Sequence, residues 1–316
     1  ELYLGRGVAA SGPLATRMGL AGVPVAAETI ALHTIFELMK STGARVHLCR
    51  LSSAAGVDLV RRARQEGLKL TCDVSINSLH LTENDIGYFD SRARLNPPLR
   101  HQRDRDALRA ALADGTIDAL VSDHTPVAAD AKTLPFAEAE PGATGLELLL
   151  SLALKWGQDS DVGLLRTLDV LTHAPAQVLG EHLGAAHSGV GQLVNGGPAD
   201  VVVFDAGAEW AVQPAQLRSQ GRHTPFEGYA VPGRVRCTRT SWRHGWRTTG
   251  LGFRRKRATG SSTASARDRA AVTAGPRPAP GTPPPARDSG PGRRRSRPGP
   301  RPGVRWSRAR RARPPA

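Results

Sequence analysis

The sequence predicts an α/β fold built on a parallel sheet, and three observations lead to this prediction. Residues 44–51 and 68–74 have the pattern of strands, and they lie on either side of a helical stretch at residues 54–65. This strand–helix–strand order is typical of right-handed parallel βαβ units. Residues 117–121 form a further apolar run, which is typical of a strand buried on both faces. That run stops at Asp123-His124-Thr125-Pro126, so polar side chains follow the carboxyl end of the strand, where α/β proteins place their chemistry.

The segments before and between these strands predict loops and helices. Residues 1–24 are rich in Gly, which indicates a loop with one short helical turn. Residues 24–41 carry a broad apolar stripe at helical spacing and therefore predict a helix. Ser52-Ser53 is suited to cap the helix at residues 54–65 because a serine hydroxyl can accept a hydrogen bond from the first free backbone N–H groups.

The stretch from the second strand to residue 179 alternates short helices with loops. Residues 82–90 indicate a short helix and turn, and residues 94–100 an extended segment because each Pro restricts the residue before it. Residues 104–114 predict a helix ended by a glycine. Residues 127–145 form a long polar loop, which is a usual place for a substrate lid and equally compatible with an exposed connection. Three further helices are expected at residues 146–156, 162–171 and 175–179.

The pattern changes twice after residue 184. Residues 199–205 and 209–212 are strand-like, which predicts a small β region over residues 185–238. From residue 239 onward the chain is rich in Arg, Pro, Gly, Ala and Ser. Such a segment cannot bury enough apolar surface to offset the entropy of ordering, so residues 239–316 are predicted to be a disordered tail.

The basic charge of the chain is concentrated in this tail. The full sequence of 316 residues has a net charge of +15, which taken alone would favour a nucleic-acid or membrane partner. Residues 251–316 hold 18 Lys and Arg against 2 Asp, which leaves 25 basic against 26 acidic residues in residues 1–250. The part predicted to fold is therefore close to neutral, and neither a nucleic acid nor a membrane is expected as its partner.

The cysteines and the apolar runs point to a reduced, cytoplasmic protein. Cys49, Cys72 and Cys237 lie far apart and form no Cys-x-x-Cys pair, so neither a disulfide framework nor a zinc knuckle is indicated. No apolar run approaches the roughly 20 residues of a membrane-spanning helix. The chain begins at Glu1 rather than Met, from which we expect that an N-terminal part is missing.

Four segments carry motifs that are informative together. Residues 43–54 contain His-Leu-Cys-Arg-Leu-Ser, residues 95–100 are Leu-Asn-Pro-Pro-Leu-Arg, residues 114–126 join Asp-Gly-Thr-Ile-Asp to Asp-His-Thr-Pro, and residues 141–147 are Pro-Gly-Ala-Thr-Gly-Leu-Glu. In this order and spacing they resemble the dihydroorotases of the amidohydrolase superfamily, and the resemblance extends to about Thr238.

The resemblance implies a TIM-like (β/α)8 barrel. Residues 1–184 would be its C-terminal part, about strands six to eight with the following helices, and residues 185–238 the small β region. It also implies a zinc centre that hydrolyses dihydroorotate to N-carbamoyl-aspartate, or closes that ring, in pyrimidine biosynthesis. One or two Zn²⁺ ions would generate hydroxide near neutral pH and polarise the carbonyl, and a carboxylate would carry a proton.

The resemblance assigns site residues position by position. Asp123 matches the strand-eight aspartate, which is a metal ligand and the base, and Asn96 matches a substrate-contacting asparagine. Arg50 stands where the family has a ligand histidine, and a guanidinium has no lone pair to donate to a metal. Val127 stands where the family has a substrate-contacting histidine, and residues 75–78 replace its Thr-Pro-His-His. The family's His-x-His occurs nowhere in the sequence.

Simpler interpretations stand beside these assignments. Asp123 could cap the turn that follows it. His124 could shuttle a proton, although a packed, hydrogen-bonded histidine is the more common case, and His47 is expected to be structural. Arg50 could clamp a substrate carboxylate. We favour the hypothesis that Arg50 fills the vacated metal pocket and pairs with Asp123, because both would project to the same end of the barrel.

The sequence therefore predicts a non-catalytic dihydroorotase-like subunit in which Asp123 is the single surviving ligand and zinc is not bound. Inactive members of the family assemble with aspartate carbamoyltransferase, so that enzyme is the expected partner. One alternative is an active zinc-dependent dihydroorotase whose remaining ligands lie upstream of Glu1. Another is nucleic-acid association through the basic tail. Because the tail replaces the apolar strand expected near the end of the family's chains, a frameshift near Thr238 is a further hypothesis.

Overall fold

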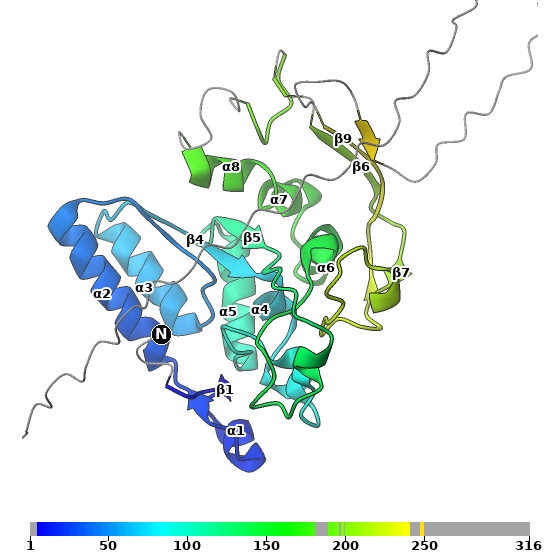
Figure 1. The fold of residues 1–316 in the computed structure, drawn as a ribbon. Coiled ribbons are helices and arrows are strands. Elements are labelled where there is room, and N and C mark those ends of the chain that lie inside the picture. The colour runs from blue at the N-terminus through cyan, green and yellow to red at the C-terminus, as the bar shows by residue number, and fades with distance from the viewer. Residues whose placement is uncertain (1–4, 181–188, 196, 199, 241–246, 250–316) are drawn as a thin grey trace, which may run out of the picture. The chain divides into compact units, whose positions relative to one another are not determined.

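Three parallel strands form the centre of the fold (Figure 1). They are β3 (Val46–Leu48), β4 (Leu70–Ser75) and β5 (Ala119–Val121), and they lie in that order. The computed structural model describes residues 5–180, 189–195, 197–198, 200–240 and 247–249. All of these belong to Glu1–Arg255, the first of the two units into which the chain divides. The three predicted strands are therefore confirmed, in a parallel arrangement.

Two long helices, α2 (Ala26–Thr42) and α3 (Ala54–Gln65), lie side by side (Figure 1). The second begins where it was predicted to begin, because the Ser53 hydroxyl accepts a hydrogen bond from the Gly56 backbone N–H at 3.0 Å. A third helix, α5 (Gln102–Ala113), packs against α3 and precedes β5. These helices confirm the predicted alternation of strands and helices.

The remaining elements of the first 180 residues are short. The glycine-rich start contains the predicted helical turn, α1 (Pro13–Met18), and two short parallel strands that pair with each other, β1 (Ala9–Ala10) and β2 (Gly22–Val23). Helix α4 (Ile76–His80) follows β4 without a loop, and it packs against α5 and α6. The other short elements are η1 (Glu83–Ile86), η2 (Ser91–Ala93), η3 (Asp130–Lys132), η4 (Leu146–Leu148), α6 (Leu149–Asp159), α7 (Leu164–Asp169) and α8 (His173–Leu179).

Antiparallel pairs make up the predicted β region. β6 (Val201–Asp205) pairs with β9 (Arg234–Thr240), and β9 pairs with β10 (Arg247–Thr249). A second pair joins β7 (Trp210–Ala211) to β8 (Ala230–Val231), and η7 (Pro214–Gln216) lies between them in the chain. The predicted boundary at residue 238 thus falls inside β9. Residues 241–246 and 250–316 of the predicted tail lie outside the described residues.

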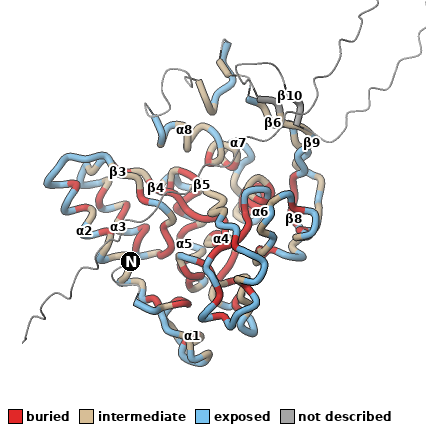
Figure 2. The backbone as a smooth tube through the Cα atoms, viewed as in Figure 1, coloured by how far each residue is buried: buried red, intermediate tan, exposed pale blue. Residues whose placement is uncertain are grey.

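The core lies between the sheet and its helices, where Figure 2 shows buried residues on the strands and on the facing sides of the helices. Burial of each large apolar side chain contributes on the order of 1.5–3 kcal/mol, so this core is the main source of stability. Fully buried core residues include Val57, Val60, Cys72, Val74, Leu108, Leu112, Ile117, Leu152 and Trp156.

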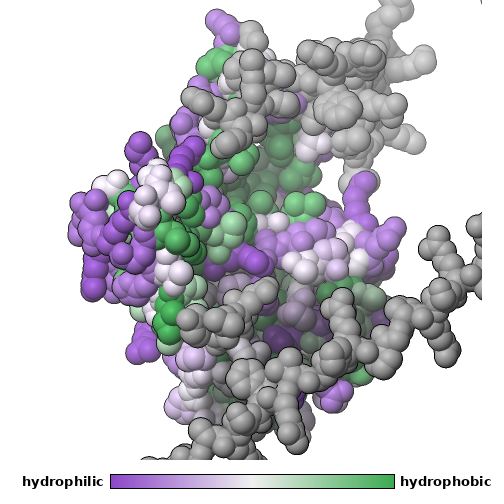
Figure 3. Space-filling view, turned by 60° about the vertical axis from the view of Figure 1, so that its left-hand side comes forward, coloured by the Kyte–Doolittle hydropathy of each residue, from purple (hydrophilic) through white to green (hydrophobic). Residues whose placement is uncertain are grey.

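Figure 3 shows a face of the molecule on which hydrophobic residues gather between hydrophilic borders. None of the described helices is long and apolar enough to cross a lipid bilayer.

Candidate functional site

Arg50 and Asp123 meet beyond the carboxyl ends of the parallel strands. Each lies two residues after its strand, since β3 ends at Leu48 and β5 ends at Val121. The Arg50 Nη1 atom lies 3.0 Å from Asp123 Oδ1 and donates a hydrogen bond to it. The predicted ion pair is therefore confirmed, and it links the ends of the two outer strands of the sheet.

The Asp123 carboxylate accepts hydrogen bonds at both oxygens. Its Oδ2 atom accepts from the Ser75 hydroxyl at 3.0 Å and from the Asn77 side-chain amide at 3.4 Å. The Asp123 side chain is only 9% exposed. Ser75 and Asn77 belong to the segment that stands in place of the family's Thr-Pro-His-His. They were noted as replacements in the sequence, but their contact with Asp123 was not foreseen.

The second predicted site residue, Asn96, lies beside Arg50. The Arg50 Nη1 atom also donates a hydrogen bond of 3.1 Å to the Asn96 backbone carbonyl. A small cavity of about 190 Å³ is lined by both residues and by Asp123 and Thr125. The structure thus brings together three of the positions that the resemblance assigned, around an Arg50 side chain that is 41% exposed.

Both members of the ion pair have an unusual backbone. Arg50 has φ 59° and Asp123 has φ 47°, a left-handed conformation that non-glycine residues rarely adopt. The backbone N–H of Arg50 donates a hydrogen bond of 2.7 Å to Asp73 Oδ1, which holds the turn in place. Such strained positions persist where surrounding contacts fix them, and they cluster at functional sites. The turn therefore directs the side chain of residue 50 toward Asp123.

The residues around Asp123 do not fit a zinc ion. The neighbours of its carboxylate are the Arg50 guanidinium, the Ser75 hydroxyl and the Asn77 amide nitrogen, and all three donate hydrogen bonds. A guanidinium offers no lone pair, and its positive charge would repel a divalent cation at this distance. Among the described residues, the ligand set implied by the resemblance is thus reduced to Asp123 at this position.

His124 is hydrogen-bonded to the backbone at this edge, and Val127 is buried there. The Nδ1 atom of His124 lies 3.2 Å from the Gly145 N–H and 3.3 Å from the Leu146 N–H, so it accepts hydrogen bonds from the backbone. This agrees with the packed, hydrogen-bonded interpretation of His124. Val127 is buried and presents an apolar side chain where the family has a histidine.

The long loop at residues 127–145 is tied down on two sides. The Lys132 ammonium donates hydrogen bonds to the backbone carbonyls of Arg94, at 2.9 Å, and Glu140, at 2.6 Å. Burial, with a further contribution from the Arg94 guanidinium, lowers the pKa of Lys132 to about 8. The Thr144 N–H donates to the His223 carbonyl at 2.7 Å, which joins the loop to the β region. The loop is therefore hydrogen-bonded to the segment that contains Asn96 and to the β region.

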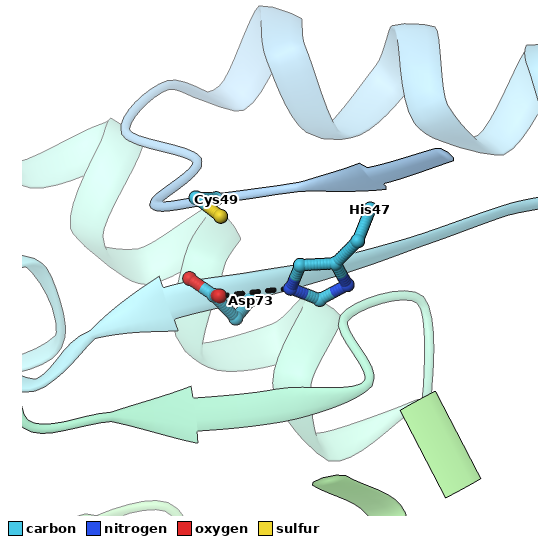
Figure 4. A group of neighbouring side chains, drawn as sticks. All are labelled: His47, Cys49 and Asp73. Atoms are coloured by element: carbon cyan, nitrogen blue, oxygen red, sulfur yellow. Dashed lines mark hydrogen bonds and ion pairs between the residues drawn. The ribbon is translucent and has the colours of Figure 1, made fainter. Parts of the chain in front are cut away.

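A second polar cluster lies on the same sheet. His47 Nε2 is 2.9 Å from Asp73 Oδ2 (Figure 4). His47 Nδ1 is 2.8 Å from the Thr71 hydroxyl. Cys49 lies next to them, and burial, followed by the Asp73 carboxylate, raises the pKa of its thiol. These contacts agree with a structural His47, but the roles of Cys49 and Asp73 were missed. Strand alternation could have indicated them. His47 pairs with Thr71, and Cys49 and Asp73 each follow two residues later, so all four side chains are expected on the same face of the sheet.

Known proteins resemble this chain over about half of their own length. No protein-family model matches it. The chain is 43% identical over 238 residues to a dihydroorotase-like protein of Pseudomonas aeruginosa, a match that covers 73% of this chain and 53% of that protein. It is 40% identical over 243 residues to a dihydroorotase of Anaeromyxobacter dehalogenans, covering 76% of this chain and 54% of that one.

Among solved structures, the chain is similar to an L-hydantoinase (dihydropyrimidinase) from Arthrobacter aurescens. The TM-score is 0.64 at 28% sequence identity, and the match covers 69% of this chain and 48% of that one. The parallel strands and their helices are thus a shared framework. The relatives and this solved structure thus point to the same group of proteins.

Proposed function

Because the chain belongs to the dihydroorotase family of the amidohydrolase superfamily, with part of that family's barrel as its fold, we propose that it is a non-catalytic dihydroorotase-like subunit. Its proposed role is to support aspartate carbamoyltransferase in pyrimidine biosynthesis. The observation that carries the proposal is the 3.0 Å contact between the Arg50 guanidinium and the Asp123 carboxylate. The Arg50 guanidinium, a cation bonded to the chain itself, stands where the resemblance implies a histidine that binds the metal.

The proposed loss of catalysis follows from what hydrolysis of a cyclic amide requires. Hydrolysis of a cyclic amide near neutral pH requires a metal-bound hydroxide and a carboxylate that is free to carry a proton. A guanidinium offers no lone pair, so the Arg50 side chain can neither bind a metal nor act as a base. Both Asp123 oxygens already accept hydrogen bonds from Arg50, Ser75 or Asn77. No water-activating group remains among these contacts.

A structural role is supported by what Arg50 connects. Its Nη1 atom bonds to Asp123, after β5, and to the Asn96 carbonyl, in the segment before α5. Hydrogen bonds to a charged group contribute about 1.5–3 kcal/mol each, less where the group is exposed as Arg50 is. The ion pair thus joins two strand ends and the segment before α5.

The proposed partner comes from the family resemblance. Inactive family members assemble with aspartate carbamoyltransferase. This chain keeps its core while an ion pair closes its site, which is compatible with the same structural role in such an assembly. The test is to express the full-length protein with the aspartate carbamoyltransferase of the same organism. The two proteins should elute together in size-exclusion chromatography, and dihydroorotate turnover should be absent with zinc added.

Turnover by the protein with Arg50 in place would contradict the proposal and favour the alternative, an active zinc-dependent dihydroorotase. Separate elution of the two proteins would contradict the supporting role. Two variants sharpen the result. R50H adds an imidazole at the ligand position, whereas R50A removes the guanidinium without adding a ligand. If zinc-dependent turnover is gained in R50H alone, the identity of residue 50 is what keeps the natural protein inactive.

A further inference from the structure

We propose that His47, Cys49 and Asp73 form a zinc-binding site that is separate from the Arg50–Asp123 pair. The ligand atoms of these three side chains, one nitrogen, one sulfur and one oxygen, all lie within 4.8 Å of one another. Zinc takes histidine, cysteine and carboxylate ligands, commonly in tetrahedral sets of three protein groups and one water. The inference concerns other side chains than the proposed function and does not depend on it.

The spacing of the ligand atoms suits this ion. With metal–ligand bonds of about 2.0–2.3 Å, neighbouring ligand atoms of a tetrahedral zinc site lie about 3.3–3.6 Å apart. His47 Nε2 and Asp73 Oδ2 are 2.9 Å apart and share a proton in a hydrogen bond. Replacing that proton by a cation requires the two atoms to separate by a few tenths of an ångström. The parallel pairing of β3 and β4 already places the side chains on one face of the sheet (Figure 4).

Two of the ligands are already oriented by further contacts. The Thr71 hydroxyl lies 2.8 Å from His47 Nδ1, so it can accept that nitrogen's proton in a hydrogen bond and leave the Nε2 lone pair for the metal. The backbone N–H of Arg50 donates to Asp73 Oδ1 at 2.7 Å, which leaves Oδ2 facing His47. Partners of this kind, which fix the tautomer of a histidine and the orientation of a carboxylate, are typical of zinc sites.

The site can be reached by an ion and has space for a water ligand. Cys49 is exposed in the described part of the chain, and the His47 side chain is 28% exposed. A cavity of about 460 Å³ borders His47, Thr71 and Asp73. The Asp73 side chain, at 8% exposure, forms the buried floor. A hydrogen bond between His47 and Asp73 would account for those two residues alone, whereas a metal site also accounts for the thiol beside them.

The test uses Co²⁺, a spectroscopic substitute for Zn²⁺, titrated into the full-length protein under reducing conditions. We expect one equivalent to bind, with a thiolate-to-cobalt absorption band in the near ultraviolet and visible bands of tetrahedral coordination, all removed by adding Zn²⁺. In C49S the thiolate band should vanish, and in H47Q the affinity should fall at least about tenfold. C237S is the matched control, because Cys237 lies on β9, and its spectrum should equal that of the natural protein.

R50A separates this site from the strand-end ion pair. That variant keeps the backbone N–H that holds Asp73, so its thiolate band should persist. The proposal is overturned if the natural protein shows no thiolate band, if the band persists in C49S, or if it is lost in C237S. Circular dichroism of each variant establishes that it is folded, and retention of the visible bands in C49S with loss of the thiolate band alone assigns the sulfur ligand directly. The result is independent of whether dihydroorotate is turned over.

Discussion

Asp73 and Arg50 are joined by a hydrogen bond of 2.7 Å from the Arg50 backbone N–H to the Asp73 carboxylate, and this bond connects two polar clusters at one edge of the sheet. The other carboxylate oxygen of Asp73 faces His47 at 2.9 Å. The conformation of residue 50 and the position of His47 therefore depend on the same side chain.

Replacing Asp73 should destabilise the fold in a graded way. D73A leaves the Arg50 N–H and His47 without their partner, so we expect a loss of about 2–4 kcal/mol of unfolding free energy. D73N keeps an oxygen that can accept from Arg50 N–H, so its loss should be clearly smaller. Urea unfolding at neutral pH measures both values. Equal losses in the two variants would show that the bond to Arg50 contributes nothing.

The Arg50–Asp123 pair should show a measurable coupling energy. Asp123 is only 9% exposed but Arg50 is 41% exposed, so solvent screening limits the coupling to about 1–2 kcal/mol. A double-mutant cycle of R50M, D123N and the double variant, followed by urea unfolding, isolates that term. R17M, on an exposed residue of α1, is the control for loss of a surface arginine. Strictly additive effects at positions 50 and 123 would contradict the interaction.

Acid should destabilise the protein through His80. Burial, the largest cause, lowers the pKa of His80 to about 4, while the hydrogen bond to the Leu152 carbonyl, 2.9 Å away, opposes it. The nearby charges of Arg109 and Lys155 lower it further, and that of Asp159 raises it. Between pH 6.5 and 4 the unfolded chain binds a proton at this residue that the folded chain does not. Stability is therefore lost as pH falls through this range.

The expected size of the His80 effect is about 3 kcal/mol at full protonation of the unfolded state. It is measured as the difference in unfolding free energy between pH 7 and the acid end of the range, in the natural protein and in H80Q. The glutamine can still donate to the Leu152 carbonyl but does not titrate. The slope with pH should be shallower in H80Q. Parallel curves for the two proteins would exclude His80 as a source of the acid loss.

Lys132 should affect stability in an alkaline range of pH. Its pKa of about 8 in the folded protein lies below the ordinary 10.5, so the unfolded chain holds more protons between these values and stability rises with pH there. K132M removes this rise. It also leaves the carbonyls of Arg94 and Glu140 without their donor, which should speed hydrogen exchange in residues 127–145. Unchanged exchange in that loop would show that Lys132 does not hold it.

Local signals in the sequence predicted the elements well. Ser53 caps α3 because the cap depends only on residues within one turn, and α2 follows from its own apolar stripe. The Arg50–Asp123 pair was also predictable, since both residues follow parallel strands that end at one edge. These features require little knowledge of how distant segments meet.

Other features depend on contacts that no local pattern encodes. The role of Asp73 arises from the register between β3 and β4 and from the left-handed turn at Arg50. The position of Lys132 depends on how a long loop folds onto residues 94 and 140, and the sequence indicates only that the loop is polar. The partners of β6 and β7 could not be predicted either, because the paired residues lie 19 to 38 positions further along the chain.

The turn at Arg50 has a consequence for the evolution of the site. Its left-handed backbone is held by a hydrogen bond from the main-chain N–H, a group that every residue except proline carries. Exchange of arginine for histidine here would therefore replace a cation by a possible metal ligand at the same backbone position. The main chain thus fixes the path of the backbone at this position and leaves its chemistry to the side chain.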